Sequence, residues 1–159
     1  MGSSSRLTVN RDMMLPDEAT TLALAGQVAA LAHAGDTVAL WGDLGSGKTV
    51  FARGFVTALT GEKDVPSPTF SLVQTYQAEG FVVSHFDFYR LESADDVREL
   101  GFDDAVADGV VLVEWPERLG NDLPDDRIDI RFRLVAAGGR FVRLEPHGSW
   151  VERLETLPG

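Results

Sequence analysis

The sequence contains no cysteine, which excludes disulfide bonds, cysteine nucleophiles and cysteine-ligated metal sites. It also has no apolar run near the roughly 20 residues that a membrane-spanning helix needs. Basic residues are scarce: 14 Lys and Arg stand against 25 Asp and Glu, for a net charge of −11. Because basic side chains supply most of the affinity for nucleic-acid phosphates, direct binding of RNA or DNA is disfavoured. We expect a cytoplasmic protein without membrane contact, whose role toward any nucleic acid runs through a protein partner.

The size of the chain suits one domain, with 159 residues of which 44% are hydrophobic. Residues 1–5 are read as an expression scar or a disordered start, so the domain is expected to cover residues 6–159. Short apolar runs at 37–41 and 110–115 predict two buried parallel strands. A helix is predicted over residues 16–34 from apolar residues at helical spacing, namely Leu22, Ala25, Val28, Ala29 and Ala32.

Weaker patterns predict the remaining elements. These are, in chain order, a strand at 7–10, a helix at 48–59, strands at 70–76 and 80–86, short helices between 93 and 108, a hairpin of 128–134 with 141–144, and a weak helix at 149–157. Together the elements predict the α/β class.

Residues 42–49, which join the strand at 37–41 to the first turn of the helix at 48–59, read Gly-Asp-Leu-Gly-Ser-Gly-Lys-Thr, which is the P-loop pattern. Its glycines allow successive backbone N–H groups to turn inward around an anion at a helix N-terminus. Lys48 is predicted to contact the β- and γ-phosphates of a nucleoside triphosphate, and the Thr49 hydroxyl to ligate Mg²⁺. The other predicted nucleotide contacts of the loop are Asp43, Leu44, Gly45, Ser46 and Gly47. The chain has no guanine-reading Asn-Lys-x-Asp motif, which favours ATP.

The P-loop refines the fold prediction to a P-loop NTPase-like three-layer sandwich with a mixed sheet. We expect a parallel core that carries the loop, extended by antiparallel hairpins.

Two carboxylates follow predicted strands. Asp87 comes directly after the strand at 80–86, and Glu114 follows the apolar residues 110–113. Ligands of open α/β sheets bind at the carboxyl ends of parallel strands, so either side chain could hold Mg²⁺ or position water. The sequence leaves alternatives open: Asp87 as a surface carboxylate or helix cap, and Glu114 in a salt bridge with Arg90 or Arg118.

Other candidates are weaker on their own. Ser67-Pro68-Thr69 lies where many P-loop NTPases keep a segment that senses the γ-phosphate, although turn chemistry also explains it. Trp115 could stack on a base, but core packing is the simpler interpretation. His85 shows no metal-ligand spacing and is interpreted as structural. Arg53 and Arg90 are possible sources of positive charge for a transferring phosphate.

Four linked motifs resemble the TsaE (YjeE) family of small bacterial P-loop ATPases. They are the P-loop at 42–49, Ser-Pro-Thr-Phe at 67–70, His-Phe-Asp-Phe-Tyr-Arg-Leu at 85–91, and Val-Glu-Trp-Pro-Glu at 113–117. Leu-Pro-Asp-Glu at 15–18, with Thr21, also looks like the family's N-terminal helix start. The resemblance covers residues 15–119, and the segment after Leu119 carries no diagnostic motif.

The resemblance implies a function. The family takes part in threonylcarbamoyladenosine formation at position 37 of tRNA, together with the proteins TsaB and TsaD. ATP hydrolysis is thought to reset the TsaB–TsaD complex, so tRNA would meet this chain only indirectly. The resemblance also implies that Lys48 and Thr49 serve the nucleotide and Mg²⁺, that Asp87 and Glu114 serve Mg²⁺ and hydrolysis, that Thr69 is the switch residue, and that Thr21 and Trp115 lie at the nucleotide.

Isolated turnover is expected to be slow and raised by the partners, because no obvious group within the chain completes the site. Two other functions remain open. A small-molecule kinase would need an acceptor pocket and usually an arginine-bearing lid, for which the residues after Glu117 offer little. A nucleotide-dependent assembly module would need ATP binding without turnover.

Overall fold

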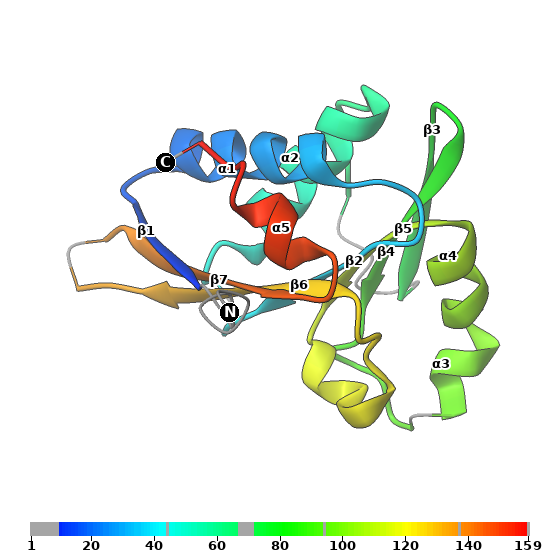
Figure 1. Ribbon diagram of the computed structural model, residues 1–159. Helices are drawn as coiled ribbons and strands as arrows, with labels where there is room; N and C mark the ends of the chain where they lie inside the picture. Colours follow the sequence, from blue (N-terminus) through cyan, green and yellow to red (C-terminus); the bar gives the residue numbers. More distant parts are fainter. Residues whose placement is uncertain (1–9, 44, 67–71, 94, 137, 159) are drawn as a thin grey trace, which may run out of the picture.

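The structure is a computed structural model that describes residues 10–43, 45–66, 72–93, 95–136 and 138–158. Within these residues, seven strands form one sheet in the order β1-β7-β6-β2-β5-β4-β3 (Figure 1). The strands are β1 (Arg11–Leu15), β2 (Thr37–Trp41), β3 (Val73–Ala78), β4 (Phe81–Asp87), β5 (Gly109–Glu114), β6 (Arg127–Leu134) and β7 (Arg140–His147).

The centre of the sheet is parallel. Strand β2 pairs in parallel with β5 and β6, and β5 pairs in parallel with β4. Antiparallel neighbours extend this core on both sides, with β3 against β4, and β7 followed by β1 beyond β6. The predicted mixed sheet is confirmed, and so is the hairpin of β6 and β7.

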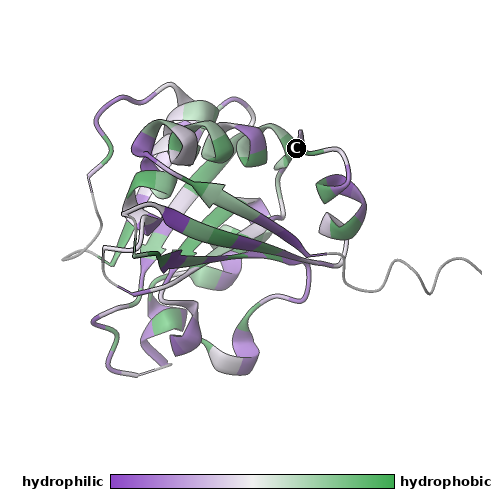
Figure 2. Cartoon of the chain, turned by 90° about the vertical axis from the view of Figure 1, so that its left-hand side faces the viewer, coloured by the Kyte–Doolittle hydropathy of each residue, from purple (hydrophilic) through white to green (hydrophobic). Residues whose placement is uncertain are grey.

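Helices cover both faces of the sheet (Figure 2). On one face α1 (Glu18–Leu31), α2 (Lys48–Thr60) and α5 (Trp150–Leu154) pack over a core that includes Val38, Leu112 and Ile130. On the other face lie α3 (Asp95–Glu99), α4 (Phe102–Asp108) and the 3₁₀ turns η2 (Pro116–Arg118) and η3 (Gly120–Asp122). This is the predicted three-layer arrangement. None of the described helices is long and apolar enough to cross a membrane.

Capping explains where α1 begins. The Asp17 side chain accepts a hydrogen bond from the backbone N–H of Thr20 at 2.9 Å, and the Thr20 hydroxyl lies 3.3 Å from the Asp17 N–H. This reciprocal pair satisfies amides that a helix start leaves free. The helix ends at Leu31, before the predicted Ala34. Ala25, Val28 and Ala29 are buried as predicted, but Leu24 is buried in place of Leu22, which is 40% exposed. Nearly every turn of α1 is apolar, so periodicity alone could not fix the side that faces the core.

The first strand also differs from the prediction. Asn10 lies outside any strand, and residues 7–9 lie outside the described part of the chain. The observed β1 starts at Arg11 because its pairing with β7 places Leu15 opposite Arg140 and buries the leucine in the core. Long-range pairing, which the local pattern could not show, sets the boundary. Similarly β3 covers Val73–Ala78 and Leu72 lies outside it, while residues 70–71, where the predicted strand began, are not described.

Candidate functional site

The P-loop connects the end of β2 to the start of α2, in the centre of the parallel sheet. Gly42 has a φ of 142°, and a Cβ there would lie 2.8 Å from the Phe132 carbonyl oxygen and 2.7 Å from Ser46 Oγ. Gly47, at a φ of 114°, is the N-cap of α2, and its carbonyl accepts the first helical hydrogen bond from Phe51 N–H at 3.0 Å. Glycine is therefore required at both ends of the loop, for space at Gly42 and for backbone conformation at Gly47.

The loop borders a pocket of about 440 Å³. The carboxyl ends of β4 and β5 form its second wall, as expected for an α/β sheet. Its lining includes seven of the residues predicted from the sequence to act together: Lys48, Thr49, Asp87, Glu114 and Trp115, and with them Gly45 and Gly47. Val50, Tyr89, Arg90 and Arg140 complete it.

Lys48 is the central cation of this pocket. Only 4% of the residue is exposed, and Nζ has no hydrogen-bond partner among the described residues. Nζ instead lies 3.8 Å from the ring centre of Trp115, at cation–π distance. Burial lowers the pKa of Lys48, and the negative charge of Glu114 opposes that shift. A buried ammonium without an acceptor is unusual, and an anionic ligand would supply the missing partner.

Asp87 and Glu114 lie opposite each other on the adjacent strands β4 and β5, and both are buried. Asp87 Oδ1 accepts a hydrogen bond from the backbone N–H of Tyr89 at 3.0 Å. Burial raises the pKa of Asp87 and the charge of Glu114 raises it further, while the Tyr89 N–H counteracts this. Two neighbouring buried carboxylates repel each other unless a cation lies between or beside them.

Glu114 has a partner that the sequence did not indicate. Its Oε2 lies 2.7 Å from Nε2 of His85, and both side chains are buried. Arg118, one of the two arginines considered as partners, donates instead to the carbonyls of Tyr89 at 3.1 Å and Leu91 at 3.4 Å. That arginine therefore fixes the loop after β4.

The remaining predicted residues have different positions. Ser46 is buried, and its Oγ has no partner within the described ranges. Asp43 is exposed, and its carbonyl accepts from Ser46 N–H at 3.1 Å. Thr21 lines a second pocket of about 200 Å³ that shares Gly47, Val50 and Arg140 with the first. Leu44 and Thr69, with the rest of the 67–69 segment, lie outside the described residues.

Sequence reasoning missed Arg140, which begins β7. Its NH2 group donates to the Gly45 carbonyl at 3.1 Å, and its NH1 group donates to the Gly138 carbonyl at 3.0 Å. Its Nε is buried and has no partner in the part of the chain that the structure describes. The pairing of β6 with both β2 and β7 brings this arginine to the loop, and no local motif signals it.

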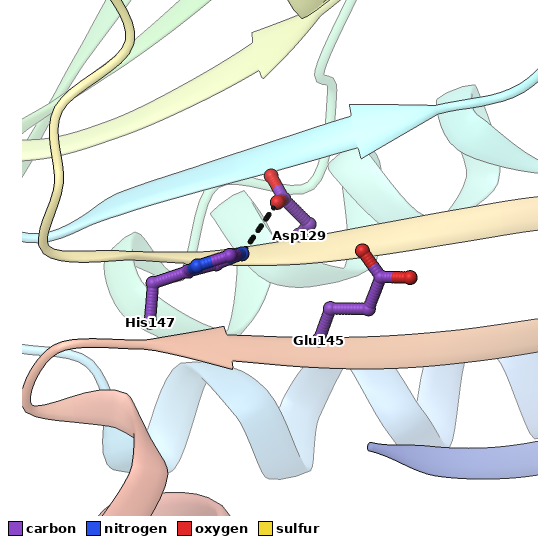
Figure 3. A group of neighbouring side chains, drawn as sticks. All are labelled: Asp129, Glu145 and His147. Atoms are coloured by element: carbon purple, nitrogen blue, oxygen red, sulfur yellow. Dashed lines mark hydrogen bonds and ion pairs between the residues drawn. The ribbon is translucent and has the colours of Figure 1, made fainter. Parts of the chain in front are cut away.

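A cluster on the sheet face opposite α1 and α2 contains Asp129, Glu145 and His147, whose potential ligand atoms lie within 4.8 Å of one another (Figure 3). Asp129 Oδ1 accepts from Trp41 Nε1 at 2.9 Å and from Arg127 Nε at 3.0 Å, and its Oδ2 lies 2.9 Å from His147 Nε2. Glu145 is paired with Arg131 at 2.8 Å. Arginines thus neutralise both carboxylates, and we interpret the cluster as support for Trp41 next to the P-loop.

Comparison with known proteins decides the family. The family model described as "Threonylcarbamoyl adenosine biosynthesis protein TsaE" matches residues 15–140. The chain belongs to the TsaE family. A curated TsaE relative from Bacillus subtilis, named a tRNA threonylcarbamoyladenosine biosynthesis protein, is 36% identical over 140 residues, 87% of this chain and 86% of the relative. A relative of the same name from Rickettsia felis is 35% identical over 138 residues, 86% of this chain and 81% of the relative.

A solved structure agrees with the family. The crystal structure of Bacillus subtilis YdiB superimposes with a TM-score of 0.78 at 29% identity, covering 93% of each chain. The matched region contains the P-loop, both strand-end carboxylates and Arg140, so TsaE membership extends over the whole pocket.

Proposed function

We propose that this chain is the ATPase subunit for threonylcarbamoyladenosine modification of tRNA position 37, and that it hydrolyses ATP to reset a complex of TsaB-like and TsaD-like proteins. The observation that carries the proposal is the buried Lys48 ammonium, which has no acceptor among the described residues and shares a pocket with Asp87 and Glu114. This combination suits a triphosphate that brings its own negative charge and a divalent cation.

The residues of the pocket fit Mg²⁺. This hard cation prefers oxygen ligands, and Thr49, Asp87 and Glu114 present a hydroxyl and two carboxylates to one cavity. Burial chiefly raises the pKa of Asp87 and the charge of Glu114 adds to it, and a bound cation would oppose both effects. When bound, Mg²⁺ would neutralise phosphate charge during transfer.

The chain's own groups divide the work. The P-loop amides and the positive end of the α2 dipole bind the phosphates, and Lys48 leaves the Trp115 face to contact the β- and γ-oxygens. Arg140 adds a second positive charge beside Gly45. Either Asp87 or Glu114 orients the attacking water, the other serving the metal. The second pocket, with Thr21, adjoins Gly47 and suits the base or sugar of the nucleotide.

The charge of the chain supports a division of labour with its partners. A net charge of −11 repels RNA, so we propose that TsaD-like and TsaB-like subunits hold the tRNA. We also propose that turnover by the isolated chain is slow and that the partners raise it.

The test measures nucleotide affinity, hydrolysis and tRNA modification with and without the two partners. Lys48→Ala is expected to weaken ATP binding at least about 100-fold, since it removes a charge-assisted contact from a buried site. Glu114→Gln and Asp87→Asn are expected to keep nucleotide binding in EDTA and to lower hydrolysis by about 10²-fold or more. Arg53→Ala is the matched control, because Arg53 is exposed on the same helix and does not line the pocket.

Three outcomes would contradict the proposal. Equal and fast hydrolysis with and without the partners would contradict the proposal that the partners stimulate the ATPase. Transfer of the γ-phosphate to a small acceptor, detected by mass spectrometry, would indicate a kinase. Full tRNA modification by Glu114→Gln and Asp87→Asn variants that cannot hydrolyse ATP would indicate an assembly module.

A further inference from the structure

We propose that His85 is a positioning residue, which fixes the carboxylate of Glu114 so that one of its oxygens faces the phosphate end of the pocket. This inference rests on the proposed function, and it assigns a role to a histidine whose sequence context indicated only a structural one. The contact that carries it joins His85 Nε2 to Glu114 Oε2 at 2.7 Å.

Strand register explains why the two side chains meet. Asp87 lies opposite Glu114, and His85 lies opposite Leu112, two residues earlier on each strand. Residues two apart on a strand share a face, so His85, Asp87 and Glu114 all lie on the side covered by α2. His85 lies one step deeper in the sheet than Asp87 and is 1% exposed. His85 therefore contacts Glu114 from a position further from the strand ends, while Asp87 lines the pocket.

The chemistry of the contact fixes its direction. An ionised carboxylate can only accept, so the hydrogen lies on Nε2 and the histidine donates. Nδ1 is buried and has no partner among the described residues, which suits the tautomer with the hydrogen on Nε2. The alternative, with a hydrogen on Nδ1, would bury an unpaired N–H.

The two carboxylates are thus anchored in the same manner. His85 holds one oxygen of Glu114, and the backbone N–H of Tyr89 holds one oxygen of Asp87. In each case one donor orients the carboxylate, and the second oxygen is available to bind a metal ion or water in the pocket. Such supporting donors usually matter for sites that hold a metal, because they set the orientation of its ligands.

The experiment compares His85→Leu, which removes the donor, with His85→Gln, which keeps an N–H at similar reach. For His85→Leu we expect kcat to fall about 10- to 100-fold, and Mg²⁺ to strengthen nucleotide binding about 10-fold less than in the unmodified chain. Nucleotide affinity in EDTA should stay within about twofold of the unmodified chain, because Lys48 and the loop amides are unchanged. His85→Gln should recover most of both losses.

A double-mutant cycle tests whether His85 acts through Glu114. In a Glu114→Ala background, His85→Leu should cause less than about a twofold further loss of kcat and of the Mg²⁺ effect. Thermal unfolding of every variant separates this from misfolding. Equal losses in both backgrounds, or no rescue by His85→Gln in a folded protein, would overturn the positioning role.

The two proposals fail in different ways. If the unmodified chain with its partners does not hydrolyse ATP, the proposed function fails, and the Mg²⁺ dependence of ADP binding still decides the role of His85. If His85→Leu leaves that dependence and kcat unchanged, the positioning role is wrong while the ATPase stands. If Mg²⁺ does not alter nucleotide binding by the unmodified chain, the proposed effect of His85 on the metal ligand is wrong, while hydrolysis still decides the proposed function.

Discussion

The Lys48 ammonium lies 3.8 Å from the ring centre of Trp115, and Trp115 adopts a φ of 61°, a left-handed conformation that is rare for a bulky residue. The ring also contacts Tyr89, with centroids 4.9 Å apart. The end of β5 thus places an indole under the only lysine of the P-loop. Backbone strain of this kind, about 1–3 kcal/mol, persists where surrounding structure holds it, often at functional sites.

This contact makes Trp115 a reporter of Lys48. When a nucleotide attracts Lys48 to its phosphates, the positive charge leaves the indole face, and the fluorescence of Trp115 should change. We expect Mg²⁺-ADP to alter the emission of the unmodified chain and to leave that of Trp115→Phe unchanged. The chain has 3 tryptophans, so the variant remains measurable through Trp41 and Trp150. A signal of full size in Trp115→Phe would show that the contact does not respond to nucleotide.

The pH dependence of stability should reveal the burial of Asp87. Its pKa is raised by burial, so the folded chain holds this proton more tightly than the unfolded chain does. This contribution to stability is present below the unfolded pKa of about 3.9 and is lost as pH rises through the folded pKa. Asp87→Asn mimics the protonated form, and we expect it to raise Tm at pH 7 by roughly 2–4 °C, as about 1 kcal/mol would in a chain of this size.

Thermal unfolding without nucleotide or Mg²⁺, at pH 7 and at pH 3.5, checks this prediction. The gain in Tm should shrink at the lower pH, where both states carry the protonated carboxyl. A gain that is equal at both pH values would point to a cause other than ionisation.

A buried ion pair between Arg153 and Asp36 holds α5 in place. Arg153 donates to both oxygens of Asp36, at 2.6 and 2.8 Å, and Asp36 is 1% exposed. Arg153→Ala leaves a buried carboxylate without this partner, which typically costs about 3–5 kcal/mol. Urea unfolding should show this loss of free energy.

The matched control for that ion pair is Arg143→Ala. Arg143 also donates to both oxygens of a carboxylate, that of Asp12, but the two side chains are 46% and 44% exposed. Exposed pairs contribute only about 0–1 kcal/mol. Similar losses for the two variants would show that burial does not govern the contribution of these arginines.

Glycine at position 42 should be irreplaceable. A Cβ at this φ of 142° would lie 2.8 Å from the Phe132 carbonyl oxygen. This oxygen is a backbone atom of β6, so it can move away only if the strand itself shifts. We expect Gly42→Ala to destabilise the chain by about 2–4 kcal/mol and to weaken nucleotide binding. Chemical denaturation and nucleotide titration check both effects.

Gly26→Ala supplies the opposite case. Gly26 lies inside α1, and a Cβ there would meet nothing within 4 Å. Alanine is the better helix former, so this variant should gain about 0.5–1 kcal/mol. Destabilisation by both substitutions would contradict the geometric argument for Gly42.

Much of the fold could be predicted from local pattern. The strand over Thr37–Trp41 and the start of the P-loop helix at Lys48 agree with prediction because apolar runs, glycine punctuation and helix starts are local signals. The start of β1 and the burial of Leu24 instead of Leu22 in α1 could not be predicted in this way. Both depend on partners distant in sequence, β7 for the strand and α2 for the helix.

The features of the candidate site can also be separated into those set by local sequence and those set by long-range packing. The sequence by itself determined the P-loop and the strand-end carboxylates. Each depends on a short contiguous segment, whose backbone conformation follows from glycine and strand propensity. Only the tertiary structure decided that Lys48 rests on Trp115, that His85 holds Glu114, and that Arg140 reaches Gly45. Strand register and sheet order set these contacts, and register follows from packing of the whole core rather than from any one segment.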